Sequence, residues 1–400
     1  METLTSCEDL GLCSVHVRAP PILTGTAMII RSDAGRTLLI VGPASFELRD
    51  GDASVLGAPL DSSRNIVTRG RQTPIEVHSP SSFRISLGQD ARVEKLDGST
   101  IPVSWREAVS ALLELAEGTA VVVGGADAGK TTLCTFLANS LIREGRRVSV
   151  VDADIGQTDL GPPTSMGAGE VTRYAVSLSQ IEPSERLFIG FTSPGRVKGK
   201  VIRYVKRLAV RHAGPEKLVI VNTDGWVTGS EAVAYKAQML DELHADITVG
   251  IGSAADVSGI LQAGKRAALL VSSPDMVKER TQVDRRELRA LGYQKYLKGS
   301  SLKTFRTNEV RLSSSLTSEI LSLRRFSRPQ LEALKELIVG FLDSDGFLQE
   351  IGILKDIVPS TMTVKTWSKI SRAPCTIEVG DVRLSSDGRE LGYARREQNG

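Results

Sequence analysis

The sequence has few cysteines and few histidines for its 400 residues. The cysteines have neither the C-x-x-C spacing of a zinc site nor the density of a disulfide-stabilised domain, so we expect a reducing intracellular location, cytoplasmic or nuclear. They are Cys7, Cys13, Cys134 and Cys375. The histidines are scattered and adjoin no cluster of metal-ligating residues, which gives no support to a metallohydrolase or a Ser-His triad. They are His16, His78, His212 and His244.

Long hydrophobic runs and an excess of one charge are also lacking. The apolar windows TAVVVGG and AALLVSS are far shorter than the roughly 20 residues that cross a bilayer. The first residues, METLTSCEDLGLCS, lack the basic and apolar parts of a secretory signal, so we expect no export and no membrane partner. Because 50 Lys+Arg against 47 Asp+Glu leave a charge of only +3, any basic surface for an anionic partner must be local.

The pattern of residue types predicts three units. Residues 1–105 contain short runs of β-forming residues broken by turn residues, which predict a small β-sandwich or barrel. Residues 106–301 alternate apolar strands with amphipathic helices, as in an α/β domain whose parallel sheet is covered on both faces. Residues 302–400 return to β-forming runs and predict a β-rich unit. At the first boundary, SWREAVSALLELAEG predicts a helix with Ser104 as its N-cap.

A phosphate-binding loop is the strongest motif of the central unit. Residues 124–131 read GGADAGKT and satisfy G-x-x-x-x-G-K-[ST] between an apolar strand and a helix with an apolar face. In such a P-loop, backbone N–H groups surround phosphate oxygens, the lysine reaches the β- and γ-phosphates, and the hydroxyl binds Mg²⁺. A chance glycine-rich turn is the alternative, and the strand-loop-helix context argues against it. The predicted nucleotide-binding residues are Gly124, Gly125, Ala126, Asp127, Ala128, Gly129, Lys130, Thr131 and Thr132.

Two carboxylates end the next predicted strand, RVSVV, within the sequence DADIGQ. Because Asp152 and Asp154 are two residues apart on an extended segment, both side chains point the same way beside the P-loop. One can hold Mg²⁺ or its water, the other can accept a proton from an attacking hydroxyl, and Gln157 can orient the nucleophile or a metal-bound water. A turn or a helix N-cap is the alternative role of such a pair.

Together with two further segments, these motifs resemble those of the P-loop polynucleotide 5′-hydroxyl kinases. Residues 152–157 match the D/E-x-D-x-G-Q motif of that family, residues 223–226 (TDGW) match its substrate-clasping T-x-G-W motif, and residues 285–289 match the Arg-x-x-x-Arg pair of its lid. The family includes archaeal RNA kinases, a subunit of the mRNA cleavage machinery and a nucleolar kinase of ribosomal RNA processing. It flanks its kinase domain with an N-terminal β-domain and a C-terminal β-rich domain, so the resemblance covers nearly the whole chain.

The resemblance implies an ATP-dependent kinase of RNA processing that phosphorylates the 5′-hydroxyl end of RNA, with DNA left open as a second acceptor, and that uses Mg²⁺ or another divalent metal. RNA-processing proteins are the expected protein partners. The catalytic residues it implies are Asp154 as general base and Lys130, Arg285 and Arg289 as cations at the transferred phosphoryl group. The metal-site residues it implies are Thr131, Asp152 and Gln157. The acceptor residues it implies are Thr223, Gly225 and Trp226, the last packing against the terminal nucleotide.

Structural roles compete with some of these assignments. A tryptophan after a strand is more often a core residue than a ligand, and arginines four apart usually line a solvated helix face. Between Lys278 and Arg306, however, nine Lys or Arg stand against three Asp or Glu, which is more lopsided than a solvated face requires.

A second basic stripe lies in the predicted helix 196–211, which carries seven Lys or Arg and no acidic residue. Because a solvated face would have compensating charges, we favour a nucleic-acid backbone as the partner of this stripe, with an acidic protein as the alternative. The cations, spaced three or four positions apart opposite an apolar stripe, are Arg196, Lys200, Arg203, Arg207 and Arg211.

Two other functions also fit a P-loop. A non-catalytic assembly factor that keeps ATP as a structural clip would show a damaged lid or acid pair, and both look intact here. A nucleotide-driven dimer switch would often carry a second lysine early in the loop, and residues 125–128 have none. The sequence does not distinguish RNA from DNA acceptors, single from double strands, or the pathway served.

Overall fold

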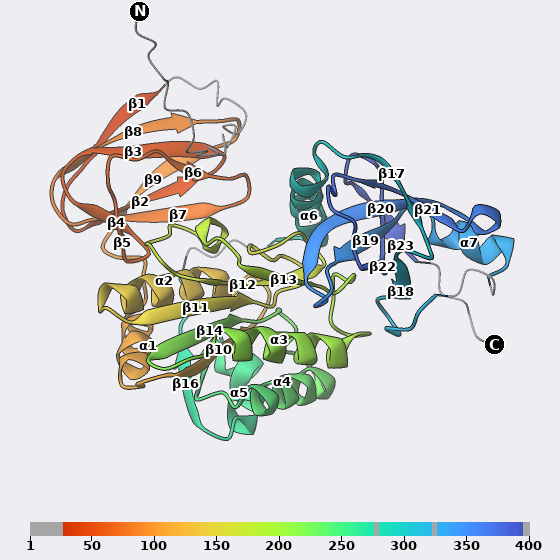
Figure 1. The fold of residues 1–400 in the computed structure, drawn as a ribbon. Coiled ribbons are helices and arrows are strands. Elements are labelled where there is room, and N and C mark those ends of the chain that lie inside the picture. The colour runs from red at the N-terminus through yellow and green to blue at the C-terminus, as the bar shows by residue number, and fades with distance from the viewer. Residues whose placement is uncertain (1–26, 276–279, 322–325, 395–400) are drawn as a thin grey trace, which may run out of the picture.

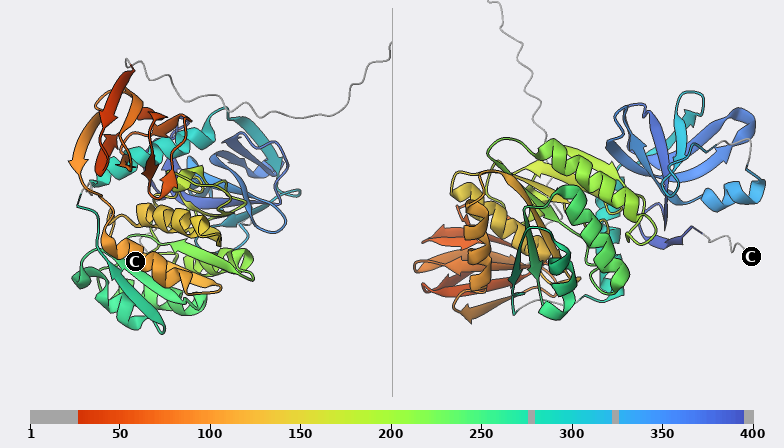
Figure 2. Two further views of the ribbon diagram at one scale, coloured as in Figure 1. Left: turned by 90° about the vertical axis from the view of Figure 1, so that its left-hand side faces the viewer. Right: turned by 90° about the horizontal axis from the view of Figure 1, so that it is seen from below.

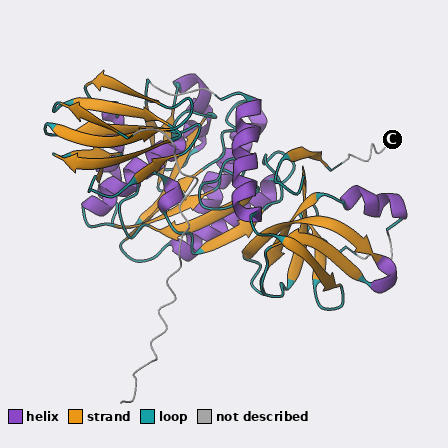
Figure 3. Ribbon diagram, turned by 90° about the horizontal axis from the view of Figure 1, so that it is seen from above, coloured by secondary structure: helices purple, strands orange, loops and turns teal. Residues whose placement is uncertain are grey.

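The computed structural model of the chain describes residues 27–275, 280–321 and 326–394. A helix-rich unit lies between two units that consist mainly of strands (Figure 1, Figure 3). None of the helices in these ranges is long and apolar enough to cross a membrane. Cys7, Cys13 and Lys278, which entered the sequence arguments, lie outside the described residues.

Two antiparallel sheets form the N-terminal unit, with strand orders β1-β8-β3-β6 and β5-β4-β7-β2-β9. Alternate side chains, such as Leu38 and Ile40 on β2 and Phe83 and Ile85 on β8, are fully buried in one apolar cluster. This arrangement fits the predicted β-sandwich. The strands are β1 (Met28–Ser32), β2 (Arg36–Val41), β3 (Ala44–Asp50), β4 (Ala53–Val55), β5 (Ala58–Pro59), β6 (Asn65–Val67), β7 (Gln72–Val77), β8 (Ser81–Leu87) and β9 (Arg92–Asp97).

The central sheet has the order β13-β12-β11-β14-β10-β15-β16. The last five strands of this order are parallel, as the sequence predicts, but β12 and β13 run antiparallel at one edge. The predicted parallel sheet is therefore present, and the glycine-rich segment SMGAGE adds an antiparallel strand to its edge despite a low β-propensity. The strands are β10 (Gly118–Gly124), β11 (Arg147–Asp152), β12 (Ser165–Glu170), β13 (Glu185–Phe188), β14 (Lys217–Asn222), β15 (Ile247–Ile251) and β16 (Ala267–Val271).

Helices cover both faces of this sheet (Figure 2). On β10, Ala120 and Val122 pack in the cluster that contains α1 and α2, whereas Val121 and Val123 pack in the cluster that contains α3 and α4. This alternation explains why the strands read as continuous apolar runs. The helices are α1 (Val103–Leu113), α2 (Lys130–Arg143), η1 (Leu178–Gln180), α3 (Lys198–His212), α4 (Ser230–Leu243) and α5 (Ala254–Ala263).

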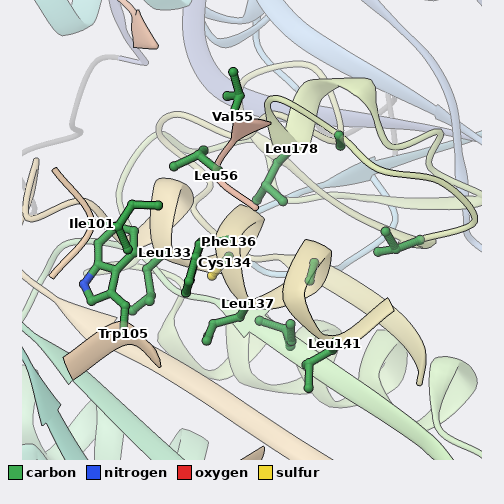
Figure 4. Close-up of a cluster of buried hydrophobic side chains, with 14 of the residues drawn as sticks. Val55, Leu56, Ile101, Trp105, Leu133, Cys134, Phe136, Leu137, Leu141 and Leu178 are labelled. Atoms are coloured by element: carbon green, nitrogen blue, oxygen red, sulfur yellow. The ribbon is translucent and has the colours of Figure 1, made fainter. Parts of the chain in front are cut away.

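The N-terminal unit packs on α2, the helix that follows the P-loop. Val55 and Leu56 of the N-terminal unit belong to the same buried cluster as Phe136 and Leu137 of α2 (Figure 4). The side chain of Asn139 reinforces this contact, because its Nδ2 donates to the Leu56 carbonyl at 2.8 Å. The N-terminal unit is thereby fixed against the nucleotide-binding helix.

Ser104 is not the N-cap that the sequence predicted. The helix α1 begins at Val103 with Pro102 in the N-cap position, and Ser104 lies in its first turn. Its Oγ instead accepts a hydrogen bond from the backbone N–H of Ser272 at 3.1 Å. The prediction failed because proline, with its fixed φ, already supplies an extended residue before the helix.

A third sheet, with the order β17-β21-β20-β19-β22-β18 and β23 paired to β22, forms the C-terminal unit. Helix α6 precedes it and lies beside β20 (Figure 1). The predicted turn at residues 343–346 connects β19 to β20, and Asp343 Oδ1 accepts from the N–H groups of Asp345 and Phe347 there. The elements are α6 (Gln282–Leu297), β17 (Ser301–Arg306), β18 (Arg311–Ser314), α7 (Arg328–Leu334), β19 (Leu337–Leu342), β20 (Leu348–Val358), η3 (Pro359–Thr361), β21 (Thr363–Ser368), β22 (Thr376–Leu384) and β23 (Glu390–Tyr393).

The basic stripe of α3 meets partners within the chain, which compensate part of its charge without a nucleic-acid backbone. Lys200 forms a buried ion pair with Glu378 of the C-terminal unit, and Arg196 pairs with Asp381 at 3.0 Å. Arg207 donates to the carbonyl of Asp345 and lies over the ring of Phe347, and Arg211 pairs with Glu185. These compensating carboxylates could not be assigned from the sequence, because all of them lie outside the helix and Glu378 and Asp381 lie more than 100 residues away.

Candidate active site

One cleft of about 1110 Å³ receives residues from all three units. The N-terminal unit contributes the turn between β6 and β7 (residues 68–72), and the C-terminal unit contributes β23. Between them lie the P-loop, the loop after β11, the T-x-G-W turn and α6. The carboxyl ends of β10, β11 and β14 therefore meet at this cleft, where ligands of α/β sheets bind.

The P-loop joins β10 to α2 as predicted. Gly129, the N-cap of α2, has a φ of 103°, a value that favours glycine. Lys130 is buried, its Nζ donates to the Gly125 carbonyl at 2.7 Å, and burial lowers its pKa. Of the predicted nucleotide-binding residues, those that line the cleft are Ala126, Asp127, Gly129, Lys130, Thr131 and Thr132. Gly124, Gly125 and Ala128 do not line the cleft.

Asp152 ends β11 and lies beneath the cleft, fully buried. Its Oδ2 accepts from Thr158 Oγ1 at 3.0 Å and from the Asp159 N–H at 2.6 Å, and its Oδ1 accepts from Asn222 Nδ2 at 2.9 Å. Burial, followed by the nearby carboxylates of Asp159 and Asp154, raises the pKa of Asp152 to about 7. Since protein donors occupy both oxygens, this carboxylate can support a metal ion through water more readily than by direct contact.

Asn222 connects the P-loop to this acid. It ends β14, the strand between β10 and β11, in register with Asp152. Its Nδ2 donates to Asp152 and also lies 3.4 Å from Thr131 Oγ1. The sequence analysis missed Asn222, because only the strand order shows that the residue before T-x-G-W lies between the two motifs.

Asp154 differs from Asp152 in that it lines the cleft. Its Oδ1 accepts from the backbone N–H groups of Gly156 at 3.2 Å and Gln157 at 3.1 Å. Burial raises the pKa of Asp154, although the Lys130 charge opposes this shift. A carboxylate with a raised pKa beside a phosphate-binding loop is suited to accept a proton.

The T-x-G-W turn follows β14, and its residues differ in position. The Thr223 hydroxyl donates to the Val122 carbonyl at 2.9 Å inside the protein, so the structure does not place it in the cleft. Gly225 and Trp226 do line the cleft. Trp226 is half-buried and stacks on Tyr235 with ring centroids 5.6 Å apart, a contact outside its predicted role.

The two predicted lid arginines lie on α6, line the cleft and point to different carboxylates. Arg285 donates from Nη2 to Asp127 of the P-loop at 2.7 Å. Arg289 forms a bidentate pair with Glu390 of β23, with distances of 2.5 and 2.9 Å. Hydrogen bonding to Glu390 raises the pKa of Arg289 despite its burial. Arg285 therefore faces the nucleotide loop, whereas Arg289 anchors the lid to the C-terminal unit.

Two further cleft residues were missed by the sequence analysis. Arg280 precedes α6, donates to Asp127 Oδ1 at 3.2 Å and lies 3.4 Å from Gln157 Oε1. Glu390 reaches the lid from more than 100 residues away along the chain. Arg280 belongs to the basic run between residues 278 and 306. The sequence therefore showed an excess of cations in this segment, but not which groups Arg280 contacts.

The residues around Thr131 fit a divalent metal ion bound together with phosphates. Within the described ranges, no group of three or more His, Cys, Asp or Glu is placed to hold a metal by itself. Mg²⁺, however, usually takes one or two protein oxygens and completes its shell with phosphates and water. Asn222 Oδ1 is buried with no hydrogen-bond partner, so an acceptor is available there for a metal-bound water.

Comparisons with known proteins match most of this chain. A protein-family model described as the P-loop of mRNA cleavage and polyadenylation factor CLP1 matches residues 124–299. The polyribonucleotide 5′-hydroxyl-kinase of Pyrococcus horikoshii is 26% identical over 323 residues, which cover 70% of this chain and 89% of that protein. The protein of the same description from Thermococcus kodakarensis is 29% identical over 328 residues, covering 70% of this chain and 92% of that one.

Solved structures show the same fold. Clp1p, in a complex with Pcf11p, superimposes with a TM-score of 0.69 over 90% of this chain and 98% of that chain, at 12% identity. The three-unit architecture is therefore shared at low sequence identity. Residues 124–299 thus match the CLP1 P-loop model, and the chain is similar to the archaeal polyribonucleotide 5′-hydroxyl-kinases in sequence and to Clp1p in fold.

Proposed function

We propose that this protein transfers the γ-phosphoryl group of ATP to the 5′-hydroxyl end of RNA, with Mg²⁺ or another divalent metal, in RNA processing. One observation carries the proposal. A Cβ at Gly225 would lie only 2.8 Å from the Cα and the N of Ala126, so the T-x-G-W turn packs directly on the P-loop. An acceptor end held at Trp226 therefore lies next to a triphosphate held by the loop. The names of the archaeal relatives support RNA as the acceptor.

In this proposal, Asp154 takes the proton of the 5′-hydroxyl while Lys130 and Arg285 stabilise the charge of the transferred group. Both cations line the cleft with Asp154. Thr131, with Asp152 and Asn222 behind it, would hold the metal ion, which when bound supplies positive charge to the phosphate oxygens. The protein contributes mainly position and charge, since phosphoryl transfer needs little covalent chemistry from side chains.

Label transfer tests the function directly. The purified protein is incubated with γ-labelled ATP, Mg²⁺ and a 5′-hydroxyl oligoribonucleotide, and we expect labelled oligonucleotide. The same oligonucleotide carrying a 5′-phosphate should remain unlabelled, and a DNA oligonucleotide of the same sequence reports whether DNA is an acceptor. Absence of transfer to every 5′-hydroxyl acceptor would contradict the proposal and favour a non-catalytic ATP-binding protein.

The role of Asp154 is tested by Asp154→Asn. Loss of a general base should lower kcat by about 10²- to 10⁴-fold while ATP binding is retained. Asp241→Asn is the matched control, because Asp241 is exposed on α4 and does not line the cleft. Equal activity of Asp154→Asn and the control would exclude Asp154 as the base.

A further inference from the structure

Asp127 stands in the middle of the P-loop, and its side chain is only 7% exposed. Its carboxylate accepts three hydrogen bonds from the segment that forms the lid. Oδ2 accepts from the Arg280 backbone N–H at 3.0 Å and from Arg285 Nη2 at 2.7 Å, and Oδ1 accepts from Arg280 Nη1 at 3.2 Å. One P-loop carboxylate thus binds both arginines at the start of the lid segment, defined here as Arg280 with α6.

Arg280 extends this connection to two other parts of the cleft. Its Nη1 lies 3.4 Å from Oε1 of Gln157, in the loop after β11. Its Nη2 donates at 3.1 Å to the carbonyl of Gly70, in the β6–β7 turn of the N-terminal unit. The position of Arg280 therefore depends on three elements that surround the cleft, and Asp127 supplies the only carboxylate among these hydrogen-bond partners.

The charge of Asp127 is wrong for a nucleotide ligand. A carboxylate within a phosphate-binding loop repels a polyphosphate unless cations neutralise it. Burial alone would raise the pKa of Asp127, but hydrogen bonds from Arg285 and Arg280 lower it, so the group is ionised at neutral pH. Two arginines against one carboxylate leave a net positive charge at the phosphate end of the cleft.

We propose that Asp127 is a positioning residue, which holds Arg280 and Arg285 beside the P-loop so that their guanidinium groups face the phosphates of ATP during transfer. The proposal rests on the kinase function proposed above. It assigns to Arg280 a role at the phosphates that sequence motifs did not indicate, and it removes Asp127 from the set of nucleotide ligands.

Asp127→Asn separates positioning from nucleotide binding. Misplaced arginines should lower kcat by about 10- to 100-fold, whereas the Kd for ATP should stay unchanged or fall, because the variant removes a negative charge near the phosphates. Asp127→Glu, which keeps the charge, should recover part of the lost kcat. Glu287→Gln is the matched control, since it removes one exposed carboxylate from the same lid helix. A weakened Kd for ATP with kcat unchanged would overturn the proposal.

A cycle of variants tests whether Asp127 acts through the arginines. In the background Arg280→Gln/Arg285→Gln, Asp127→Asn should have little further effect on kcat, because the groups it positions are gone. If Asp127→Asn lowers kcat by the same factor in this background as in the wild type, Asp127 acts independently of the two arginines. That result would count against the proposal.

A measurement without catalysis keeps this inference separate from the kinase function. Hydrogen exchange of the nucleotide-free protein should be faster in peptides covering residues 280–290 of Asp127→Asn than in those of the wild type or Glu287→Gln. If exchange is faster in Asp127→Asn but the wild type phosphorylates no acceptor, the positioning role of Asp127 stands and only the kinase function is rejected. Unchanged exchange in these peptides would reject the positioning role even in an active kinase.

Discussion

The side-chain amide of Asn222 lies between two motifs that are far apart in the sequence, 2.9 Å from Asp152 Oδ1 and 3.4 Å from Thr131 Oγ1. The strand order explains this relationship, because β14 lies between β11, which ends in Asp152, and β10, which leads into the P-loop. The metal-site hydroxyl and the buried acid are therefore connected through the central strand rather than directly.

Burial of Asp152 should make the stability of the free protein pH-dependent. Its pKa is raised to about 7, against about 4 for an unfolded aspartate, so between these values the folded state keeps a proton that the unfolded state releases. This contribution to stability is present below pH 4, declines as the pH rises towards 7, and is absent above it. Asp152→Asn removes the titrating group, so the metal-free and nucleotide-free variant should lack the loss of about 1–3 kcal/mol that the wild type shows between pH 5 and pH 8.

Urea unfolding of the wild type and Asp152→Asn at pH 5 and pH 8 measures this effect. The stability of the variant relative to that of the wild type should be higher at pH 8 than at pH 5. Asp33→Asn is the control, because Asp33 is exposed in the turn between β1 and β2. The same difference between variant and wild type at both pH values would show that Asp152 does not titrate between them.

The ion pair between Lys200 and Glu378 should be a strong point of attachment for the C-terminal unit. Both side chains are less than 10% exposed, and Ser315 Oγ lies 2.7 Å from each partner. Glu378→Ala leaves a buried ammonium group without its counter-charge, and should cost about 3–5 kcal/mol of stability. The double variant Lys200→Met/Glu378→Leu should recover most of this loss, because replacement of a buried pair by apolar residues is often neutral.

Lys206→Met is the matched control for this prediction. Lys206 lies on the same helix and pairs with Glu242, but both side chains are more than 40% exposed, so we expect a loss of at most about 1 kcal/mol. Unfolding midpoints of the four proteins measure the effects. Equal losses of stability for Glu378→Ala and Lys206→Met would mean that burial does not increase the contribution of the Lys200–Glu378 pair to stability.

The local parts of the fold and of the site could be predicted from the sequence. The P-loop, the acid pair at the end of β11 and the turn after β14 each depend on neighbours within a few residues, so their residue types and spacing identify them. Contacts between distant segments could not be predicted in this way. Glu390 at Arg289, Glu378 at Lys200 and the antiparallel strand β12 all depend on which segments the tertiary fold brings together.

The stripe on α3 illustrates this limit. The helix does lack acidic residues, and its cations do pair with carboxylates that lie outside the helix. The C-terminal unit supplies part of this negative charge through Glu378 and Asp381, and no local sequence pattern distinguishes such partners from a polynucleotide backbone. The same limit concealed Asn222 and Arg280, because their importance depends on what lies across the cleft rather than on their neighbours in sequence.

Trp226 should affect acceptor binding without affecting ATP binding. One face of its ring stacks on Tyr235, whose hydroxyl donates to Asp224 Oδ2 at 2.9 Å, so the indole is held rigidly while it lines the cleft. A base stacked on a rigid aromatic ring contributes about 1–3 kcal/mol. Trp226→Ala should therefore raise the KM for a 5′-hydroxyl oligoribonucleotide by about 5- to 150-fold, and Trp226→Phe should raise it much less.

Tyr174→Ala provides the control for this experiment, because Tyr174 is 40% exposed and does not line the cleft. Steady-state kinetics with each substrate varied in turn separate the two KM values. The KM for ATP should stay within about twofold of the wild type in all three variants, since the proposed function places the acceptor rather than the nucleotide at Trp226. A rise in the KM for ATP that matches the rise for the oligonucleotide would instead indicate that Trp226 supports the P-loop through the turn at Gly225, and that the acceptor stacks elsewhere.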